Sequence, residues 1–266
     1  MDVNILGVIG VVEILLILLA GRGGIFVTMM RSAIAEEFLA ARPGLIDKIQ
    51  AFDQRRGSML LRGLYNEPDP INFLALLAEV RTGLFLDPLC SALRYNAPID
   101  GKQPDWSGTI NGQRVICEVL RLNTPEEDAW VSIERSREWR KFQIENPGVP
   151  FGYHTGAGTI DTAYLCGAQS KVQFKEEKYR KIIERYQLPY IICVNPSVET
   201  FINDIDMHDF LMGRHGFFAR DEHFGRNVAG VLLHGYFAGH WVYYSNDKAQ
   251  FPLSDVNKQA IADRAD

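Results

Sequence analysis

Two acidic residues, Asp105 and Glu118, flank a turn whose sequence places them opposite each other. The dipeptide Asn111-Gly112 lies between two short runs of strand-forming residues. It predicts a two-residue hairpin turn of type I′, because both central residues of that turn need positive φ. The register set by this turn puts Asp105 directly opposite Glu118 on one face of the hairpin. Two such carboxylates repel each other, and a divalent cation between them would remove that cost. The alternative is a solvated hairpin with two unrelated acids.

The residues around these two acids resemble a known motif. Pro104-Asp105, followed by Glu118-Val119-Leu120, is similar to the motif of the PD-(D/E)xK nuclease superfamily, which has the restriction-endonuclease-like fold. The resemblance covers roughly residues 69–195 and implies that Asp105 and Glu118 bind Mg²⁺ or Mn²⁺. In the family, a lysine two residues after the Glu assists the attacking water. Leu120 occupies that position here and Arg121 follows it, so the resemblance is to a divergent member that lacks the motif lysine.

Three lysines on a predicted helix offer a replacement for the missing lysine. The segment Ser170–Gln187 has a strong helical pattern, and Lys171, Lys175 and Lys178 fall on one face of it. If one of them points toward the carboxylates, the resemblance implies that it orients the water or neutralises the transition state. Lys175 sits midway on this face and is our prediction for the catalytic lysine. The alternative is a solvated charged face.

A third acid, Glu79, interrupts an apolar helix that precedes the motif. Asp69-Pro70 predicts the start of this helix, with Asp69 as N-cap and Pro70 at the first helical position. The resemblance implies that Glu79 is a further metal ligand, since the family often has a Glu on the helix before the motif strands. The alternative is an exposed or paired surface glutamate.

The remaining chain predicts an α/β protein. Further helices are predicted over 31–41, 45–55, 124–145 and 197–213, and strands over 93–97, 188–195, 228–234 and 241–245. The resemblance implies a restriction-endonuclease-like core of order α-β-β-β-α-β, a mixed sheet flanked by helices, with extra N-terminal helices and C-terminal strands. Residues 147–167 contain five glycines without clear periodicity and predict a functional or mobile loop.

The first thirty residues differ from the rest in composition. Residues 5–20 are apolar except for Gly7, Gly10 and Glu13, which is shorter than the roughly 20 residues of a spanning helix. Three interpretations of residues 1–30 stay open: an over-extended start with the true start at Met29 or Met30, a membrane anchor, and a helix packed on the domain. An anchor would hold the following domain on the inner, cytoplasmic face of a membrane, through contact of residues 5–20 with lipid.

The predicted organisation places one main domain after this segment. Residues 31–66 are predicted to form a helical lead, 67–253 the nuclease-like α/β domain, and 254–266 a polar tail that is either a short helix or disordered. Four cysteines have no metal-ligand spacing, and we predict buried, reduced thiols in a cytoplasmic protein. They are Cys90, Cys117, Cys166 and Cys193.

The charge of the chain limits how it could meet nucleic acid. The formal net charge of −5 argues against a broadly basic surface but leaves room for a local basic groove. The lysines of the 170–187 helix could contribute to such a groove, as could a basic cluster on the preceding predicted helix. This cluster consists of Arg135, Arg137, Arg140 and Lys141.

Together these features lead to one principal hypothesis about function. The resemblance implies a metal-dependent nuclease that hydrolyses phosphodiester bonds in nucleic acid, DNA rather than RNA, with Asp105, Glu118 and Lys175 as catalytic residues. The alternative is a catalytically inactive module of the same fold that binds nucleic acid or a protein partner, with Leu120 marking the lost chemistry. A third hypothesis is a membrane-tethered scaffold.

Overall fold

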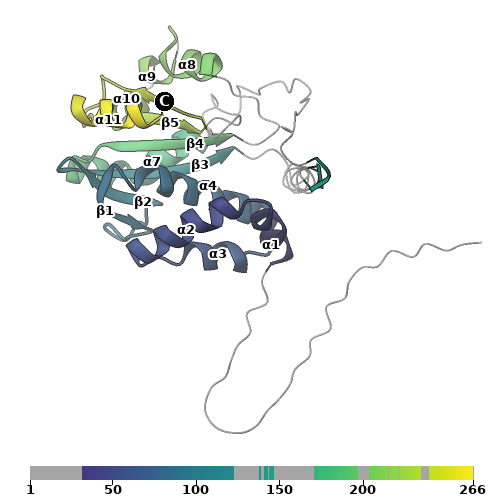
Figure 1. The fold of residues 1–266 in the computed structure, drawn as a ribbon. Coiled ribbons are helices and arrows are strands. Elements are labelled where there is room, and N and C mark those ends of the chain that lie inside the picture. The colour runs from purple at the N-terminus through teal and green to yellow at the C-terminus, as the bar shows by residue number, and fades with distance from the viewer. Residues whose placement is uncertain are drawn as a thin grey trace, which may run out of the picture. The chain divides into compact units, whose positions relative to one another are not determined.

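A six-stranded mixed sheet, in the order β1-β2-β3-β4-β5-β6, forms the centre of the structure (Figure 1). The first three strands pair antiparallel, β3, β4 and β5 run parallel, and β6 is antiparallel to β5. The strands are β1 (Cys90–Tyr95), β2 (Trp106–Ile110), β3 (Gln113–Leu122), β4 (Tyr190–Pro196), β5 (Val228–His234) and β6 (Trp241–Ser245). The predicted α/β class is therefore confirmed.

The computed structural model describes residues 32–122, 171–196, 204–214, 216–220, 222–234 and 240–265, together with 138, 141–142 and 144–146. Several predicted features lie outside these residues. They are the segment 1–30, most of the helix over 124–145 with Arg135, Arg137 and Arg140, the loop 147–167, and Cys166.

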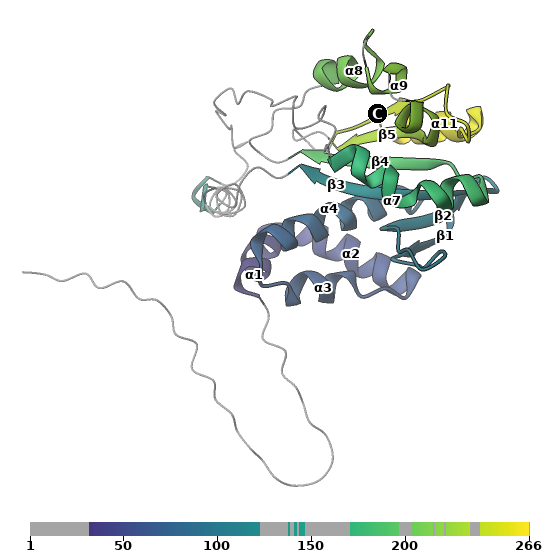
Figure 2. The ribbon, with the colours of Figure 1, turned by 180° about the vertical axis from the view of Figure 1, so that it is seen from behind.

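Helices cover both faces of the sheet. The first group is α1 (Ala33–Ala40), α2 (Pro43–Arg56), α3 (Leu60–Asn66) and α4 (Pro70–Leu86). The second group is α7 (Lys171–Tyr186), α8 (Asp204–Met212), α9 (Phe217–Arg220) and α10 (Glu222–Asn227). α4 lies in front of the sheet in Figure 1, and α7 lies in front of it in the reverse view of Figure 2, so these two helices pack on opposite faces.

The alternation of side chains along the strands gives each face its own core. Cys117 and Val119 of β3 join the core beneath α4, whereas Ile116 and Leu120 join the core beneath α7. All seven residues of β5 are buried, as expected for a central strand of a sheet that is covered on both faces. Glu118 follows the same alternation, so its side chain belongs to the α7 face.

The hairpin between β2 and β3 has the predicted turn and register. Asn111 has a φ of 45° and Gly112 a φ of 85°, and type I′ turns need positive values at both positions. Paired positions run from Ile110–Gln113 to Trp106–Cys117. Continuing this register by one residue sets Asp105 opposite Glu118, so the predicted register is confirmed.

Several element boundaries differ from those predicted, and the causes are local. α2 begins at Pro43 rather than at Leu45, because proline is well suited to the first turn of a helix, where its missing N–H costs nothing. β1 begins at Cys90, three residues before the predicted start, and has an irregularity at Ala92, whose φ is 50°. α4 has the predicted start, since the Asp69 side chain accepts a hydrogen bond from the Asn72 N–H.

The C-terminal segment forms a helix, α11 (Asp255–Ala265), which decides between the two predicted states of the polar tail. Its Asn257 is fully buried and binds the β2–β3 turn: the Asn257 amide donates to the Ile110 carbonyl at 3.0 Å and accepts from the Asn111 amide at 3.0 Å. α11 therefore supports the turn that sets the register of Asp105 and Glu118.

Three of the four cysteines, Cys90, Cys117 and Cys193, are buried and form no disulfide, as predicted. Among the residues that the structure describes, no helix has both the length and the apolar character needed to cross a membrane.

Candidate active site

Asp105 lies directly before β2 and is tied to β3 by two hydrogen bonds. Its backbone N–H donates to Glu118 Oε1 at 3.1 Å, and its own Oδ2 accepts from the Val119 N–H at 2.7 Å. At this position, one residue beyond the last backbone-paired residues of β2 and β3, side chains replace backbone groups as hydrogen-bond acceptors. The hairpin register therefore brings the two predicted acids together.

Glu118 is fully buried in the middle of β3 and is paired with a cation from α7. Lys175 Nζ donates to Glu118 Oε2 at 2.5 Å and lies 3.9 Å from Asp105 Oδ2. Lys178 Nζ also lies 3.9 Å from Glu118 Oε2, and its side chain is more exposed than that of Lys175. Lys175 thus points toward the carboxylates, and Lys178 lies near Glu118 but stays exposed. Nothing is described of the Lys171 side chain.

Glu79 approaches the same group of charges from α4. The Tyr95 hydroxyl donates to Glu79 Oε2 at 2.5 Å, and the Trp106 indole N–H donates to the Glu79 carbonyl at 2.9 Å. Burial raises the pKa of the Glu79 carboxyl, and the negative charge of Glu118 adds to the rise. Glu79 is therefore a partly buried acid close to the site. It is not an exposed glutamate, and the alternative of a paired glutamate stays open because it accepts from Tyr95.

The pKa values show an excess of negative charge that the lysines do not fully compensate. Burial, followed by the charges of Glu118 and Glu79, raises the pKa of Asp105 to about 7. Burial lowers the pKa of Lys175, but Asp105 and Glu118 outweigh it and hold that pKa above its ordinary value. Lys175 is accordingly charged near neutral pH, while Asp105 is partly protonated.

Leu120 packs into the core beneath α7, where its side chain is 5% exposed. It lies two residues after Glu118 and on the same face of β3. The position that carries a lysine in the family motif therefore has an apolar side chain here. The ammonium group comes instead from Lys175, across the interface between β3 and α7. A basic group in this place was predicted; its catalytic role stays a prediction.

Two tyrosines near Glu118 were not predicted from the sequence. The Tyr179 hydroxyl donates to the Gln103 carbonyl at 2.7 Å, close to the segment that leads into Asp105. Among the described residues, the buried Tyr190 hydroxyl has no hydrogen-bond partner. Burial raises the pKa of Tyr190, and the charges of Glu118 and Tyr179 raise it further. Tyr179 follows Lys175 by one helical turn, so the helical period could have predicted that it lies on the same face. No local pattern predicts the position of Tyr190 on β4.

The chemistry of the carboxylates fits a hard divalent cation. Within the described residues, no three His, Cys, Asp or Glu side chains come together as a potential metal-holding group. Mg²⁺, however, usually binds through only one or two carboxylates and keeps several waters, so a set of two carboxylates meets its needs. Asp105 and Glu118 form such a pair. Burial first, and then the charges of Glu118 and Glu79, raise the pKa of Asp105, and a cation at this place would favour its charged form.

Comparison with protein-family models, curated proteins and solved structures found no match for this chain. The chemistry of the site is therefore inferred from its own residues.

Proposed function

We propose that this protein is a metal-dependent nuclease that hydrolyses phosphodiester bonds in nucleic acid, DNA rather than RNA. The observation that carries the proposal is the meeting of Asp105, Glu118 and Lys175 in one partly buried cluster, with Lys175 Nζ 2.5 Å from Glu118 Oε2. The motif resemblance supplies Asp105 and Glu118. This chain has Leu120 where the motif has a lysine, and Lys175 of α7 lies beside Glu118 instead.

The order of elements supports the finer fold within this proposal. Among the elements whose bounds the structure gives, α4, β1, β2, β3, α7 and β4 occur in the order α-β-β-β-α-β, with helical residues at 138, 141–142 and 144–145 between β3 and α7. This is the core order of the restriction-endonuclease-like fold. α1, α2 and α3 are then the extra N-terminal helices, and β5 and β6 the extra C-terminal strands.

In the proposed mechanism, Asp105 and Glu118 would hold Mg²⁺ or Mn²⁺, with Glu79 as the further candidate ligand. A divalent cation in such a site lowers the pKa of a water molecule and stabilises negative charge on the phosphate. Asp105 must lose its proton to act as a ligand, so metal affinity rises as the pH passes about 7. Lys175 keeps its proton, and its ammonium group stabilises the negative charge that develops on the phosphate.

A cleavage screen tests the proposal. Duplex DNA, single-stranded DNA and RNA are incubated with the protein and Mg²⁺, Mn²⁺ or a chelator. We expect metal-dependent cleavage, faster on DNA than on RNA, that disappears in Asp105→Asn. No cleavage of any substrate, or equal cleavage by Asp105→Asn, would contradict the proposal.

A second candidate function is favoured by Leu120 at the motif lysine position: an inactive module of the same fold that binds nucleic acid or a protein partner. Thermal melts with Mg²⁺ and Mn²⁺ separate the two functions, because an intact metal site stabilises the folded state by RT ln(1 + [L]/Kd). An inactive module would bind nucleic acid without cleaving it and would show little metal-induced stabilisation.

A further inference from the structure

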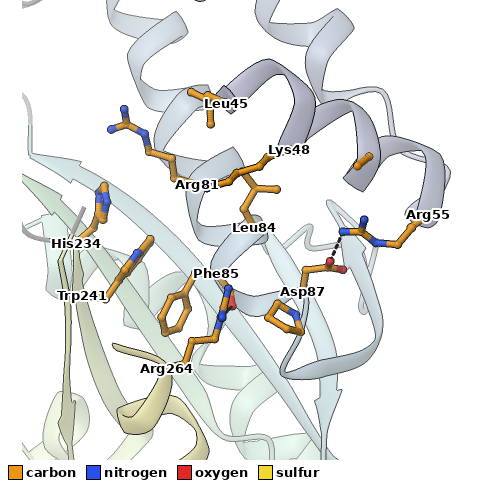
Figure 3. Close-up of a pocket in the computed structure, with 12 residues that line it drawn as sticks. Leu45, Lys48, Arg55, Arg81, Leu84, Phe85, Asp87, His234, Trp241 and Arg264 are labelled. Atoms are coloured by element: carbon orange, nitrogen blue, oxygen red, sulfur yellow. Dashed lines mark hydrogen bonds and ion pairs between the residues drawn. The ribbon is translucent and has the colours of Figure 1, made fainter. Parts of the chain in front are cut away.

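A second concave site lies on the α4 side of the sheet (Figure 3). Its volume is about 690 Å³, within the range of small-molecule sites in proteins. Helices α2, α4 and α11 and the facing ends of β5 and β6 contribute its walls. None of the described residues that line it belongs to the candidate active site, so the two sites share no described side chain.

The charge of this cavity is strongly positive although the protein as a whole is acidic. Lys48 and Arg55 of α2, Arg81 of α4 and Arg264 of α11 all line it. Asp87 is the one carboxylate among the described lining residues, and it is already paired: Arg55 donates to its Oδ2 at 2.6 Å (dashed in Figure 3), and Arg56, outside the lining, to its Oδ1 at 2.7 Å. The described residues that line the cavity therefore carry more positive than negative charge.

Two of these cations retain donors for a ligand. Arg264 Nε donates to the Phe85 carbonyl at 2.8 Å, and its guanidinium lies 5.6 Å from the centre of the Phe85 ring. This contact fixes the guanidinium and leaves its terminal N–H groups unpaired within the described chain. Lys48 makes no ion pair or hydrogen bond within those residues, and it is an exposed residue that lines the cavity.

A stacked aromatic wall completes the cavity. The Trp241 ring lies between His234, at 4.2 Å between ring centres, and Phe85, at 4.5 Å. The Asn195 amide nitrogen lies 2.6 Å from His234 Nδ1, and burial together with the charge of Arg81 lowers the pKa of His234 to about 3. The neutral ring therefore accepts at Nδ1 and carries its proton on Nε2. The indole N–H of Trp241 is a further hydrogen-bond donor among the lining residues.

We propose that this cavity binds a ligand that carries two or more phosphate groups. Lysine, arginine and the indole N–H offer donors and no acceptors, so the ligand must bring the acceptor oxygens. Guanidinium and ammonium groups together bind phosphate oxygens with charge-assisted hydrogen bonds. Cations on three separate helices suit a ligand with several negative groups better than a single carboxylate. A free nucleotide and a nucleic-acid backbone share this chemistry. The proposal does not depend on nuclease activity.

Calorimetric titration of the full chain with tripolyphosphate tests the binding. We expect saturable binding that weakens by about tenfold or more in Lys48→Glu and in Arg264→Glu. Lys181→Glu is the matched control, since it makes the same charge change at an exposed position of α7 outside the cavity. Lys48→Glu removes no contact within the described residues, so a folding defect is not expected to confound it. No saturable binding, or equal weakening in the control, would overturn the proposal.

A competition experiment then separates the two sources of phosphate. A nucleoside triphosphate and a short DNA duplex are each tested for displacement of tripolyphosphate, with chelator present to prevent cleavage. Displacement by the nucleotide alone supports a small-molecule site, and displacement by the duplex supports a backbone contact. Displacement by neither would contradict a site for ligands of this class. The readout is binding, so loss of cleavage in Asp105→Asn leaves it unaffected and the two proposals can fail separately.

Discussion

Two glutamates of this protein, Glu118 and Glu176, are both fully buried and both paired with a cation, yet their surroundings differ. Glu176 of α7 accepts two hydrogen bonds from Arg180, at 2.9 and 2.6 Å, and a third from the Asn227 amide at 2.7 Å. Its charge is balanced by one guanidinium in a bidentate arrangement. This is a satisfied ion pair that joins α7 to α10.

Glu118 has a different balance of charge. It accepts from Lys175 and from the Asp105 N–H, but two further carboxyl groups, Asp105 and Glu79, raise the local negative charge. Burial of a charge is tolerated where partners compensate it. Glu176 has that compensation, whereas the pKa values of Asp105 and Glu79 are raised around Glu118. This difference in charge balance is why we propose a ligand or reaction at the Glu118 cluster and not at the Glu176 cluster.

The largest expected effect is on cleavage by variants of the two glutamates. Glu118→Gln removes a proposed metal ligand and is expected to lower the cleavage rate by about 10³-fold. Glu176→Gln keeps the size of the side chain but loses an acceptor for Arg180 or Asn227, so it is expected to lower stability while cleaving at close to the wild-type rate. Single-turnover assays at saturating metal measure both. If both variants lost cleavage rate equally, the loss would reflect the removal of a buried charge and not the removal of a metal ligand.

Lys175 and Arg180, the cations paired with Glu118 and Glu176, should also differ in their effect on the cleavage rate. Lys175→Ala is expected to slow single-turnover cleavage by about 10²–10³-fold, the usual loss for one transition-state contact. Arg180→Ala should leave the rate unchanged and lower the melting temperature. Lys171→Ala and Lys178→Ala complete the series. If all three lysine variants cleave at the wild-type rate, no lysine of this face has the catalytic role, and Arg121 becomes the remaining basic candidate beside the motif.

Removing an acid from each cluster should change the free energy of unfolding in opposite directions. Glu176→Ala is expected to cost about 1–3 kcal/mol of unfolding free energy, because it leaves the buried Asn227 amide without its partner. Asp105→Asn is expected to raise stability without metal, since it removes one of the repelling charges, and to abolish stabilisation by Mg²⁺. Denaturant unfolding with and without metal gives both values. An Asp105→Asn protein that behaves like wild type in both conditions would show that the acids do not interact.

The pH dependence of stability follows from Asp105. Its pKa rises from 3.8 in the unfolded chain to about 7 in the fold, so the folded state binds more protons between these values. The contribution of Asp105 to stability is therefore present below about pH 4 and is lost as the pH rises toward 7. Metal-free melts across this window should show a decline that is shallower in Asp105→Asn. An identical slope in both proteins would contradict the raised pKa.

The smallest effect concerns the turn that holds Asp105 against Glu118. Gly112 has a φ of 85°, and an added Cβ would meet no atom within 4 Å, so Gly112→Ala tests backbone strain alone. It is expected to cost about 1 kcal/mol. Gly44→Ala, which also has free space but lies in the first turn of α2, is the control and should not destabilise. No loss in Gly112→Ala would weaken the argument from register.

Local patterns in the sequence were sufficient for part of this site. The positive φ values required at Asn111 and Gly112 determine the hairpin register, and that register alone sets Asp105 opposite Glu118. The helical period of 3.6 residues places Lys175 and Lys178 on one face of α7. These predictions succeeded because each depends on residues within one hairpin or one helix, where backbone geometry determines the neighbours.

The tertiary structure decided which charges meet, since contacts between distant segments depend on how the helices pack against the sheet. α7 lies on the face of β3 that carries Glu118, so Lys175 reaches the site while its neighbour Glu176 is buried against Asn227, 51 residues away. The sequence was equally compatible with both residues on a solvated surface. The Tyr95 contact to Glu79 and the cations gathered from α2, α4 and α11 around the second cavity arise in the same way. No local pattern encodes such pairings, because burial and packing of the whole core select them together.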